Sequence, residues 1–321
     1  MNTHLSPKDL ALAIGVSESS LKRWVDEGRL SASRTVGGHR RIAMHEAIRF
    51  IRNTGSTEVR ETGIRTVTGN VVVDDRMFAS FDLTDGPVQS VAVGSGEAQL
   101  LAALQAGKAE LARGIILAQY LGSRSVAQVC DGPITYAMHR LGELWRHSEQ
   151  GITVEHRALN ICIEAMHQIR QLLSPVSETA PVAVGGAMEQ DPYMLPTLMA
   201  ATCFMEMGVR DVNLGANTPV ANILDAARAS KARFVWLSVS TVGDKVNLAE
   251  QVHKLGAGAS EIGATVLLGG REVHSLGGAP VKNVHVIHSM SELVSFVRSA
   301  LARPSPSEGA RTNGRATAIR Q

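Results

Sequence analysis

The sequence S-E-S-S-L-K-R-W-V-D-E-G-R-L at Ser17–Leu30 is followed within a few residues by R-T-V-G-G-H-R-R-I at Arg34–Ile42. In the first segment, Leu21 and Trp24 recur at helical spacing and predict one buried helix face. Ser17 is placed to cap this helix by accepting a hydrogen bond from a backbone amide three residues on. In the second segment, two adjacent glycines permit a tight turn between two short strands. Together the segments predict a short helix beside a basic hairpin.

A second helix is expected upstream. The apolar residues from Leu5 to Ile14 predict a short first helix, with Gly15 in the turn and Gly28 ending the helix that follows. Residues 1–55 carry nine Lys and Arg against five Asp and Glu, an excess of four. Charge alone does not distinguish a DNA-binding domain from a small helical domain with a solvated basic edge. The interpretation therefore rests on the order of helix, turn and basic hairpin in the motif.

This segment resembles the winged helix-turn-helix of the MerR family of transcription regulators, in which T-x-G-G-H-R-R forms a wing after the recognition helix. The resemblance covers about residues 4–53. It implies that recognition-helix side chains enter the major groove of double-stranded DNA and that the wing contacts phosphates. The candidate DNA-binding residues are Ser19, Ser20, Lys22 and Arg23 on the recognition helix and Arg34, Thr35, His39, Arg40 and Arg41 on or beside the wing.

The whole chain has 321 residues, a formal net charge of +2 and a mean hydropathy near zero. This length predicts two or three compact domains. No apolar stretch approaches the roughly 20 residues of a membrane span, and residues 1–6 lack signal-peptide character, so a cytoplasmic protein is expected. Cys130, Cys162 and Cys203 are odd in number and widely spaced, which predicts buried thiols rather than disulfides or a zinc site.

Two segments lack the pattern of a packed domain. Residues 56–95 are rich in Gly, Thr, Ser and Asp without a heptad repeat, and they predict a linker after the DNA-binding domain of residues 1–55. Residues 303–321 have almost no apolar side chains and predict a disordered tail.

Four amphipathic runs between residues 96 and 176 predict a four-helix bundle. Before the last run stands L-W-R-H-S-E-Q-G-I-T-V-E-H at Leu144–His156. From the residues alone, we expect Trp145 to fill the bundle core and Glu155 and His156 to cap and solvate the next helix. The same W…E-H arrangement resembles the helical cap that precedes cobalamin-binding domains. That resemblance implies that Trp145 covers the upper face of a corrin and that Glu155 and His156 reach its upper axial group.

Residues 177–302 alternate short apolar strands with helices, which predicts a Rossmann-like (flavodoxin-like) parallel sheet with helices on both faces. Ligands of such sheets bind beyond the carboxyl ends of the strands. The predicted strands are Pro181–Gly185, Val209–Leu214, Phe234–Ser238, Thr265–Leu268 and His285–Ile287. The predicted helices are Leu195–Met207, Val220–Ala229, Val246–Leu255 and Met290–Leu301.

Three loops at that edge resemble the cobalamin-binding Rossmann-like domain: L-G-A-N-T-P at Leu214–Pro219, S-V-S-T at Ser238–Thr241 and L-G-G at Leu268–Gly270. With the cap and the wing, residues 4–300 are similar to the cobalamin-dependent, light-responsive MerR-type repressors of the CarH and LitR type. The resemblance implies adenosylcobalamin as cofactor. The candidate cofactor-binding residues in this domain are Asp191, Tyr193, Gly215, Ser238, Ser240, Thr241, Gly269 and Gly270.

The first loop departs from that family. The family has D/E-x-H-x-x-G there, in which His replaces dimethylbenzimidazole as lower cobalt ligand, the acid orients the His, and the Gly leaves room for the displaced nucleotide tail. This chain reads D-P-Y-M-L-P, so Asp191 remains, Tyr193 stands at the His position and Pro196 at the Gly position. A phenol, with an unperturbed pKa of about 10, is a poor cobalt ligand at neutral pH. Proline adds bulk where the tail would pass.

Four interpretations of this site remain open. The domain binds cobalamin with its own base coordinated or with no lower ligand; it binds another tetrapyrrole, since a Tyr phenolate can ligate haem iron; it binds an unrelated molecule; or it has lost ligand binding and serves assembly. No metal site built from protein side chains is predicted.

The order of the modules predicts a sequence-specific transcription regulator that is not an enzyme. It would repress by binding promoter DNA as a homodimer or homotetramer, affecting RNA polymerase indirectly, and a ligand or light would change its assembly. The rival class is an enzyme component, a cobalamin-dependent methyltransferase carrier, against which the missing lower-ligand His argues. The remaining alternatives are a ligand-free regulator that uses the domain only for assembly and an adaptor without ligand or DNA.

Overall fold

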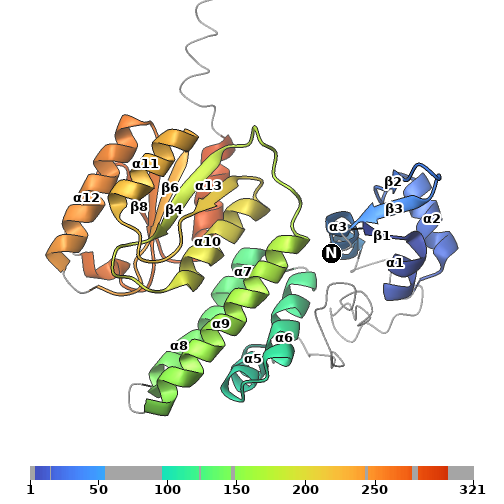
Figure 1. Ribbon diagram of the computed structural model, residues 1–321, viewed down its shortest axis with the longest axis horizontal. Helices are drawn as coiled ribbons and strands as arrows, with labels where there is room; N and C mark the ends of the chain where they lie inside the picture. The colour runs from blue at the N-terminus through green and yellow to red at the C-terminus, as the bar shows by residue number, and fades with distance from the viewer. Residues whose placement is uncertain are drawn as a thin grey trace, which may run out of the picture.

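The structure, a computed structural model, describes residues 4–14, 16–54, 96–122, 124–145, 149–242, 245–276 and 281–302. They form an amino-terminal unit of residues 4–54, a helical cap of residues 96–172 and a sheet unit of residues 182–302 (Figure 1). The predicted linker at 56–95 and the predicted disordered tail at 303–321 lie outside the described residues. No helix in the described part of the chain is long and apolar enough to cross a membrane.

Two short helices of the amino-terminal unit form the predicted helix-turn-helix. They are α1 (Pro7–Ala13) and α2 (Glu18–Asp26). The Ser17 hydroxyl caps α2 by accepting a hydrogen bond from the Ser20 amide at 3.1 Å. Gly28 follows the end of α2 with φ +72°, a backbone conformation that favours glycine. The predicted cap and helix end are therefore confirmed.

The wing is an antiparallel hairpin of β2 (Ser33–Arg34) and β3 (Arg40–Ala43), as predicted. A third strand, β1 (His4–Leu5), pairs with the other edge of β3. The prediction that Leu5 belongs to the first helix is therefore wrong. Leu5 lies opposite Ile42, and both side chains are buried, so pairing with a distant strand overrides the local helical pattern.

The helix α3 (Met44–Thr54), which was not among the predicted elements, completes the amino-terminal unit. Its buried side chains include Ile48, Phe50 and Ile51. The Phe50 ring packs against that of Trp24, with ring centroids 5.1 Å apart, which joins α3 to α2. α3 also contacts the cap.

The cap is the predicted four-helix bundle, with one helix interrupted. Its helices are α5 (Gly96–Gln105), α6 (Ala109–Leu121), α7 (Val126–Val129), α8 (Thr135–Trp145) and α9 (Glu149–Leu172). A π-helical turn at Cys130–Ile134 joins α7 to α8 and contains Pro133. Proline has no backbone N–H to donate within a helix, which accounts for the irregular turn. α7 and α8 together thus form the third member of the bundle.

The sheet unit has five parallel strands in the order β5-β4-β6-β7-β8, the flavodoxin-like order. The strands are β4 (Val182–Ala187), β5 (Arg210–Asn213), β6 (Phe234–Ser238), β7 (Thr265–Gly269) and β8 (Val284–Ile287). All five predicted strands are present. Parallel pairing aligns their carboxyl ends, which places the three glycine- and serine-containing loops along one edge of the sheet.

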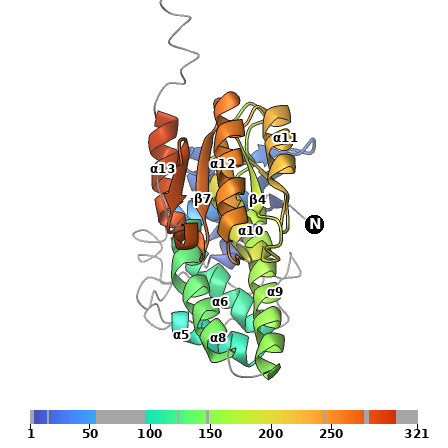
Figure 2. The ribbon, with the colours of Figure 1, turned by 90° about the vertical axis from the view of Figure 1, so that its left-hand side faces the viewer.

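Helices cover both faces of the sheet. They are α10 (Met194–Glu206), α11 (Val220–Ser230), α12 (Lys245–Glu261) and α13 (Met290–Ala302). α12 continues six residues beyond the predicted end at Leu255. α10 and α13 share a hydrophobic core with the cap, whereas α11 and α12 pack on the opposite face. Figure 2 shows that the cap helices lie below the sheet unit.

Two polar contacts attach the cap to the sheet unit. Arg170, near the end of α9, pairs with Asp211 of β5 at 2.9 Å. Asp131, in the π-helical turn, accepts hydrogen bonds from the Met290 and Ser291 amides at the start of α13, both at 2.8 Å. A carboxylate is favourable at a helix amino terminus. The cap and the sheet unit are thus held together by charge as well as by a common core.

Candidate functional site

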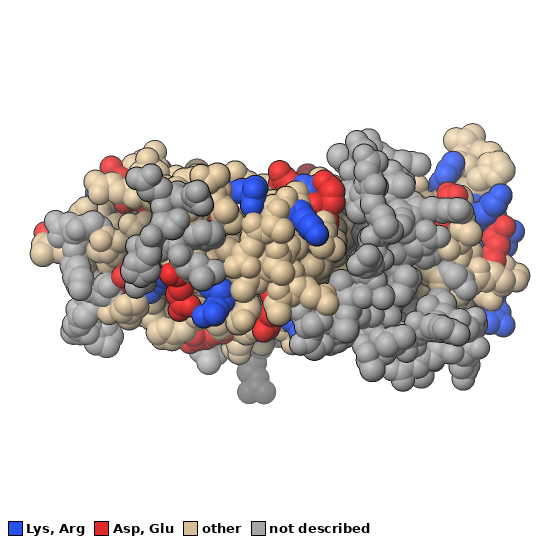
Figure 3. Space-filling model, turned by 90° about the horizontal axis from the view of Figure 1, so that it is seen from below, with Lys and Arg blue, Asp and Glu red and all other residues tan. Residues whose placement is uncertain are grey.

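The solvent-facing side of α2 carries the predicted recognition residues. Ser19 is exposed, and its hydroxyl lies 2.8 Å from that of Ser17. Ser20 is half-buried and uses its amide in the helix cap. Lys and Arg side chains lie on this end of the molecule, away from the cap and the sheet unit (Figure 3). Of the two predicted serines, Ser19 is the better placed to touch DNA.

Within the described part of the chain, two cations on α2 pair with exposed carboxylates of the same segment. Lys22 lies 2.8 Å from Glu18, and Arg23 lies 3.7 Å from Glu27. Exposed pairs of this type are worth about 0.3–0.5 kcal/mol. Both cations can therefore exchange these partners for a phosphate or a base edge at little energetic cost.

The wing is a tight basic loop. The Thr35 amide donates to the His39 carbonyl at 2.9 Å, and the Thr35 hydroxyl accepts from the His39 amide at 3.2 Å. Gly38 has φ +78°, which the turn requires. Arg34 and His39 are exposed, and Arg41 is half-buried on β3. These hydrogen bonds close the turn between the two strands and place the wing arginines on β2 and β3 beside it.

Arg40 has a different setting from the other wing residues. Its guanidinium Nη2 lies 2.5 Å from Asp26 Oδ1, and its Nη1 donates to the Lys22 carbonyl at 3.3 Å. The side chain is 21% exposed. Arg40 thus connects the wing to the last turn of α2, and we infer that it positions the wing as well as contributing positive charge.

At the carboxyl edge of the sheet, Asp191 holds two loops together. Its side chain is fully buried and accepts hydrogen bonds from the backbone amides of Tyr193 at 3.0 Å and Ser240 at 2.5 Å. Its carbonyl accepts a hydrogen bond from the Asn217 amide in a third loop. Burial raises the pKa of the Asp191 carboxyl, and the amides of Ser240, Tyr193 and Thr241 oppose that rise. Asp191 therefore binds backbone amides and holds together the loops at the carboxyl edge of the sheet.

Tyr193 and Pro196 form the beginning of α10. Tyr193 is the residue before the first helical position, and its side chain is half-buried. Pro196 lies in the first turn, where a missing N–H leaves no helical hydrogen bond unmade. The loop thus supplies a phenol where the resembled family supplies an imidazole, and a rigid ring where it supplies a glycine.

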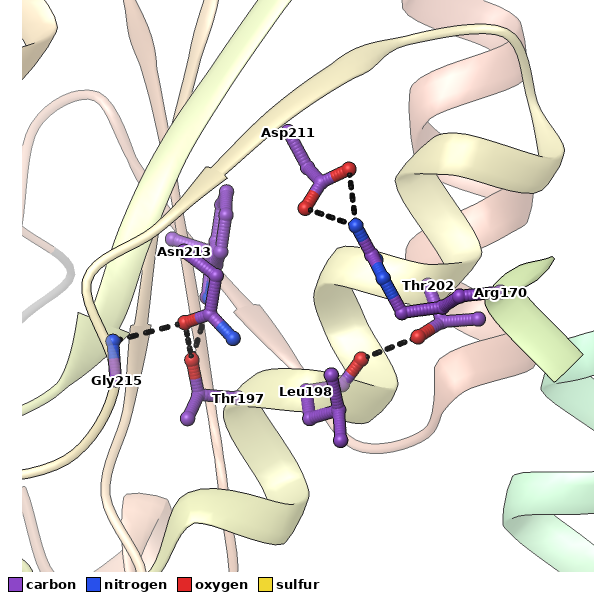
Figure 4. Close-up of polar contacts among 8 residues, drawn as sticks. Arg170, Thr197, Leu198, Thr202, Asp211, Asn213 and Gly215 are labelled. Atoms are coloured by element: carbon purple, nitrogen blue, oxygen red, sulfur yellow. Dashed lines mark hydrogen bonds and ion pairs between the residues drawn. The ribbon is translucent and has the colours of Figure 1, made fainter. Parts of the chain in front are cut away.

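A hydrogen-bonded cluster fills the space between α10 and the sheet (Figure 4). The Thr197 hydroxyl donates to Asn213 Oδ1 at 2.5 Å. Trp236 Nε1 donates to the Thr197 hydroxyl at 3.4 Å. The Gly215 amide also donates to Asn213 Oδ1, at 3.0 Å. Trp236 is 2% exposed, and a Cβ on Gly185 would overlap its ring. The indole thus occupies the room that Gly185 leaves beside α10.

The three predicted glycines lie at a positive φ angle or at a close backbone approach. Gly215 has φ +83° and Gly270 has φ +115°, and a Cβ on Gly270 would overlap the backbone of Val239. Gly269 ends β7, where an added Cβ would lie 3.3 Å from the Ile287 carbonyl oxygen. Backbone conformation at Gly215 and close packing at Gly269 and Gly270 therefore account for these glycines with or without a ligand.

Ser238 carries an unsatisfied polar atom. Its hydroxyl is buried at the end of β6 and has no hydrogen-bond partner among the described residues. The hydroxyl of its neighbour Ser240 is likewise buried without a partner among the described residues, although the Ser240 amide donates to Asp191 and the Ser240 carbonyl accepts from Arg271 at 3.0 Å. Half-buried Thr241 follows. A buried polar group without a partner is unfavourable, so the Ser238 and Ser240 hydroxyls are the groups of this edge that a ligand could satisfy.

The three predicted cofactor-binding residues of the cap lie on α8 and α9. Trp145 ends α8, and its side chain lies outside the described residues. Glu155 is half-buried and His156 is exposed, both in the first half of α9. No group of three or more His, Cys, Asp or Glu side chains within the described ranges could hold a metal ion. All three cysteines are buried and free.

The structure brings Asp191, Gly215 and Ser238 to one edge, with their loops bonded to each other. The cluster of Trp236, Thr197 and Asn213 did not emerge from the sequence, although an Asn at the carboxyl end of a predicted strand is a detectable signal. Nor did the pairing of Arg40 with Asp26, which depends on how the wing folds back on α2.

Residues 5–54 match the family model described as a helix-turn-helix domain, and residues 97–170 match the one described as a B12 binding domain. A comparison with curated protein sequences finds no match.

Solved structures of similar fold include corrinoid proteins. The monomethylamine corrinoid protein of Methanosarcina barkeri is 13% identical with a TM-score of 0.51, covering 65% of this chain and 100% of its own. A cobalamin-binding protein from Desulfitobacterium hafniense DCB-2 is 16% identical with a TM-score of 0.34, covering 64% and 98%. The methanol:cobalamin methyltransferase complex MtaBC of Methanosarcina barkeri is 13% identical with a TM-score of 0.34, covering 80% and 97%.

The chain thus joins an amino-terminal helix-turn-helix domain to a cobalamin-binding-like domain of helical cap and parallel sheet, as predicted. At 13% identity the structural likeness shows the fold alone. The MerR-type assignment stays a prediction.

Proposed function

We propose that this chain is a sequence-specific DNA-binding transcription regulator of the MerR type, acting as a repressor, in which the cap and the sheet unit form the effector domain. The observation that carries the proposal is the exposed basic face of the winged helix-turn-helix. Lys22 and Arg23 on α2 have only weak partners, and the wing presents Arg34 and His39 beside them. Such a surface fits a major groove flanked by phosphates.

Helix-turn-helix regulators commonly bind two half-sites about one helical turn apart as dimers. We therefore propose that this chain binds promoter DNA as a homodimer or homotetramer and hinders RNA polymerase by occupying the site. The protein itself is then not a catalyst.

Selection of duplexes from a random library by the purified full chain tests DNA binding. The expected result is enrichment of one motif with two related half-sites. Arg23→Ala is expected to relax the preference at one base pair of each half-site, a loss of about 1–3 kcal/mol there. Arg49→Ala, on α3, is the control and should leave the motif unchanged. A library without any enriched motif would contradict the proposed function.

The sheet edge fits a corrinoid only in part. Two observations favour a bound group: the Ser238 and Ser240 hydroxyls have no hydrogen-bond partner among the described residues, and the cap matches the B12 binding model. The first loop supplies no imidazole, and Trp236 closes the space beside α10 that a nucleotide tail would need. We propose that a corrinoid binds between this edge and the cap with its nucleotide tail outside the sheet unit. The bound corrinoid would supply a light-sensitive cobalt centre.

This mode predicts that the nucleotide tail contributes little affinity. Cobinamide, which lacks the tail, is expected to bind within about threefold of cobalamin, because a part of the ligand that makes no contact adds no free energy. Titration of the visible absorption of each corrinoid measures this. A preference for cobalamin of a hundredfold or more would show that the tail is inserted.

The same titration separates the alternatives. Tyr193→Phe should leave corrinoid affinity unchanged, whereas it should abolish binding if the bound group is haem ligated by a phenolate. Absence of any tetrapyrrole from protein supplied with both would favour a ligand-free effector domain. A methyl carrier, the enzyme-component alternative, is disfavoured because Tyr193 stands where such carriers place the cobalt-ligating His.

A further inference from the structure

Arg52, in the last turn of α3, contacts the other two units of the molecule. Its Nη2 donates to the Arg124 carbonyl at 3.0 Å, and its guanidinium carbon lies 4.0 Å from the centre of the Tyr120 ring. Its Nη1 lies 3.6 Å from Glu206 Oε1. Tyr120 and Arg124 belong to the cap, and Glu206 is the last residue of α10 in the sheet unit. One side chain thus connects all three units.

Glu206, the carboxylate that pairs with Arg52, is itself fixed by hydrogen bonds. Both carboxylate oxygens of Glu206 accept from the Val126 amide, at 3.0 and 3.2 Å, at the start of α7. Burial raises the pKa of Glu206, and the Val126 amide, Arg52 and Arg298 oppose that rise. The charged form of Glu206 is therefore stabilised by the Val126 amide first and also by Arg52, which comes from the amino-terminal unit.

The contact is shielded from water. The side chains of Arg52 and Glu206 are 19% and 14% exposed, and Tyr120 is 3% exposed. A guanidinium over a desolvated aromatic face contributes more than an exposed ion pair does. α3 also packs against α6 and α9 around this point. The amino-terminal unit is thus docked by a specific polar contact set within an apolar interface.

Docking through α3 leaves the DNA-facing side open. α2 and the wing lie on the side of the amino-terminal unit that faces away from the cap (Figure 1). The docked arrangement therefore sets the direction in which α2 points without covering it.

Among the described residues, the contacts of α3 with the cap and with Glu206 therefore relate the recognition helix to the effector domain.

We propose that Arg52 is a positioning residue: by docking α3 on Tyr120 and Glu206 it sets the distance and orientation between the two recognition helices of the assembled regulator, and so the half-site spacing that it accepts. This inference rests on the proposed DNA-binding function. The docking contact of Arg52 does not depend on that function, and it can be measured without DNA.

The first experiment is small-angle X-ray scattering of the full chain alone. Arg52→Ala is expected to increase the radius of gyration and the maximum dimension, because the amino-terminal unit separates. Arg49→Ala is the matched control: Arg49 lies one turn earlier on α3, is 55% exposed and pairs within the helix with Glu46, so it should scatter like the wild type. Arg52→Lys keeps the charge without the planar guanidinium and is expected to fall between the two. Identical scattering from Arg52→Ala and the wild type would overturn the docking role.

The second experiment measures affinity for duplexes that carry the selected half-sites at altered spacing. The wild type is expected to prefer one spacing by about tenfold or more, and Arg52→Ala to bind all spacings within about threefold while keeping its affinity for a single half-site. A merely destabilised protein would instead lose half-site affinity as well. An unchanged spacing preference in Arg52→Ala would overturn the inference, whereas failure of every protein to bind DNA would refute the proposed function and leave the scattering result to decide the docking.

Discussion

Arg41→Ala is expected to weaken binding to the selected duplex about tenfold and to reduce the slope of log affinity against log salt by about one unit. Arg41 lies on β3 of the wing, where its charge can replace a counterion at a phosphate. Because phosphates carry no sequence information, the loss should be nearly equal for specific and random duplexes. Fluorescence anisotropy at several salt concentrations measures both quantities. An unchanged affinity and slope would show that the wing does not contact DNA.

Arg40→Ala is expected to cause a larger loss than Arg41→Ala, because it also frees the wing from α2. Asp26, which pairs with Arg40, separates charge from positioning. If Arg40 acted through charge alone, Asp26→Ala would strengthen binding by removing a carboxylate near the DNA. The positioning role predicts that Asp26→Ala weakens binding instead. A tighter complex with Asp26→Ala would therefore reject that role.

The second large effect is expected at Asp191. Asp191→Ala should lower the free energy of unfolding by about 3 kcal/mol, because it leaves the buried amides of Tyr193 and Ser240 without an acceptor. Chemical denaturation measures the loss. Glu189→Ala changes an exposed side chain in the same loop, and its free energy of unfolding should remain within about 0.5 kcal/mol of that of the wild type. A small effect of Asp191→Ala would mean that Asp191 does not hold the loops together.

Asp191 also gives a pH dependence of definite sign. Its pKa in the folded protein lies above the value of 3.8 for an unperturbed carboxyl, because of burial. The folded state therefore binds the proton more tightly than the unfolded state, and its contribution to stability is full below pH 3.8 and lost as the pH rises through the folded pKa. The stability of the wild type relative to Asp191→Asn should fall over that interval.

The elements with local patterns were predictable from sequence. All five strands of the sheet alternate with helices at regular spacing, and α2 with its wing combines a Ser17 cap, an apolar face and a glycine turn. β1 was not predictable, because a two-residue strand is defined by its pairing with β3 and not by its own residues. The break between α7 and α8 was not expected either, although Pro133 offered a signal.

The candidate sites divide in the same way. The glycines and Asp191 could be placed at the sheet edge from strand ends alone, since parallel strands end together. The indole of Trp236 beside Gly185 could not, because the face on which a buried strand residue lies is not visible in a continuously apolar run. Arg52 and Glu206 lie far apart in the chain, and only the packing of three units brings them together.

The measurement that tests the account most directly is the affinity of the full chain for its selected duplex with and without bound corrinoid, in darkness and after illumination. A regulator whose effector domain controls assembly predicts a change in dissociation constant of about five- to 150-fold between two of these states. The same dissociation constant in all of them would contradict an effector role for the cap and the sheet unit.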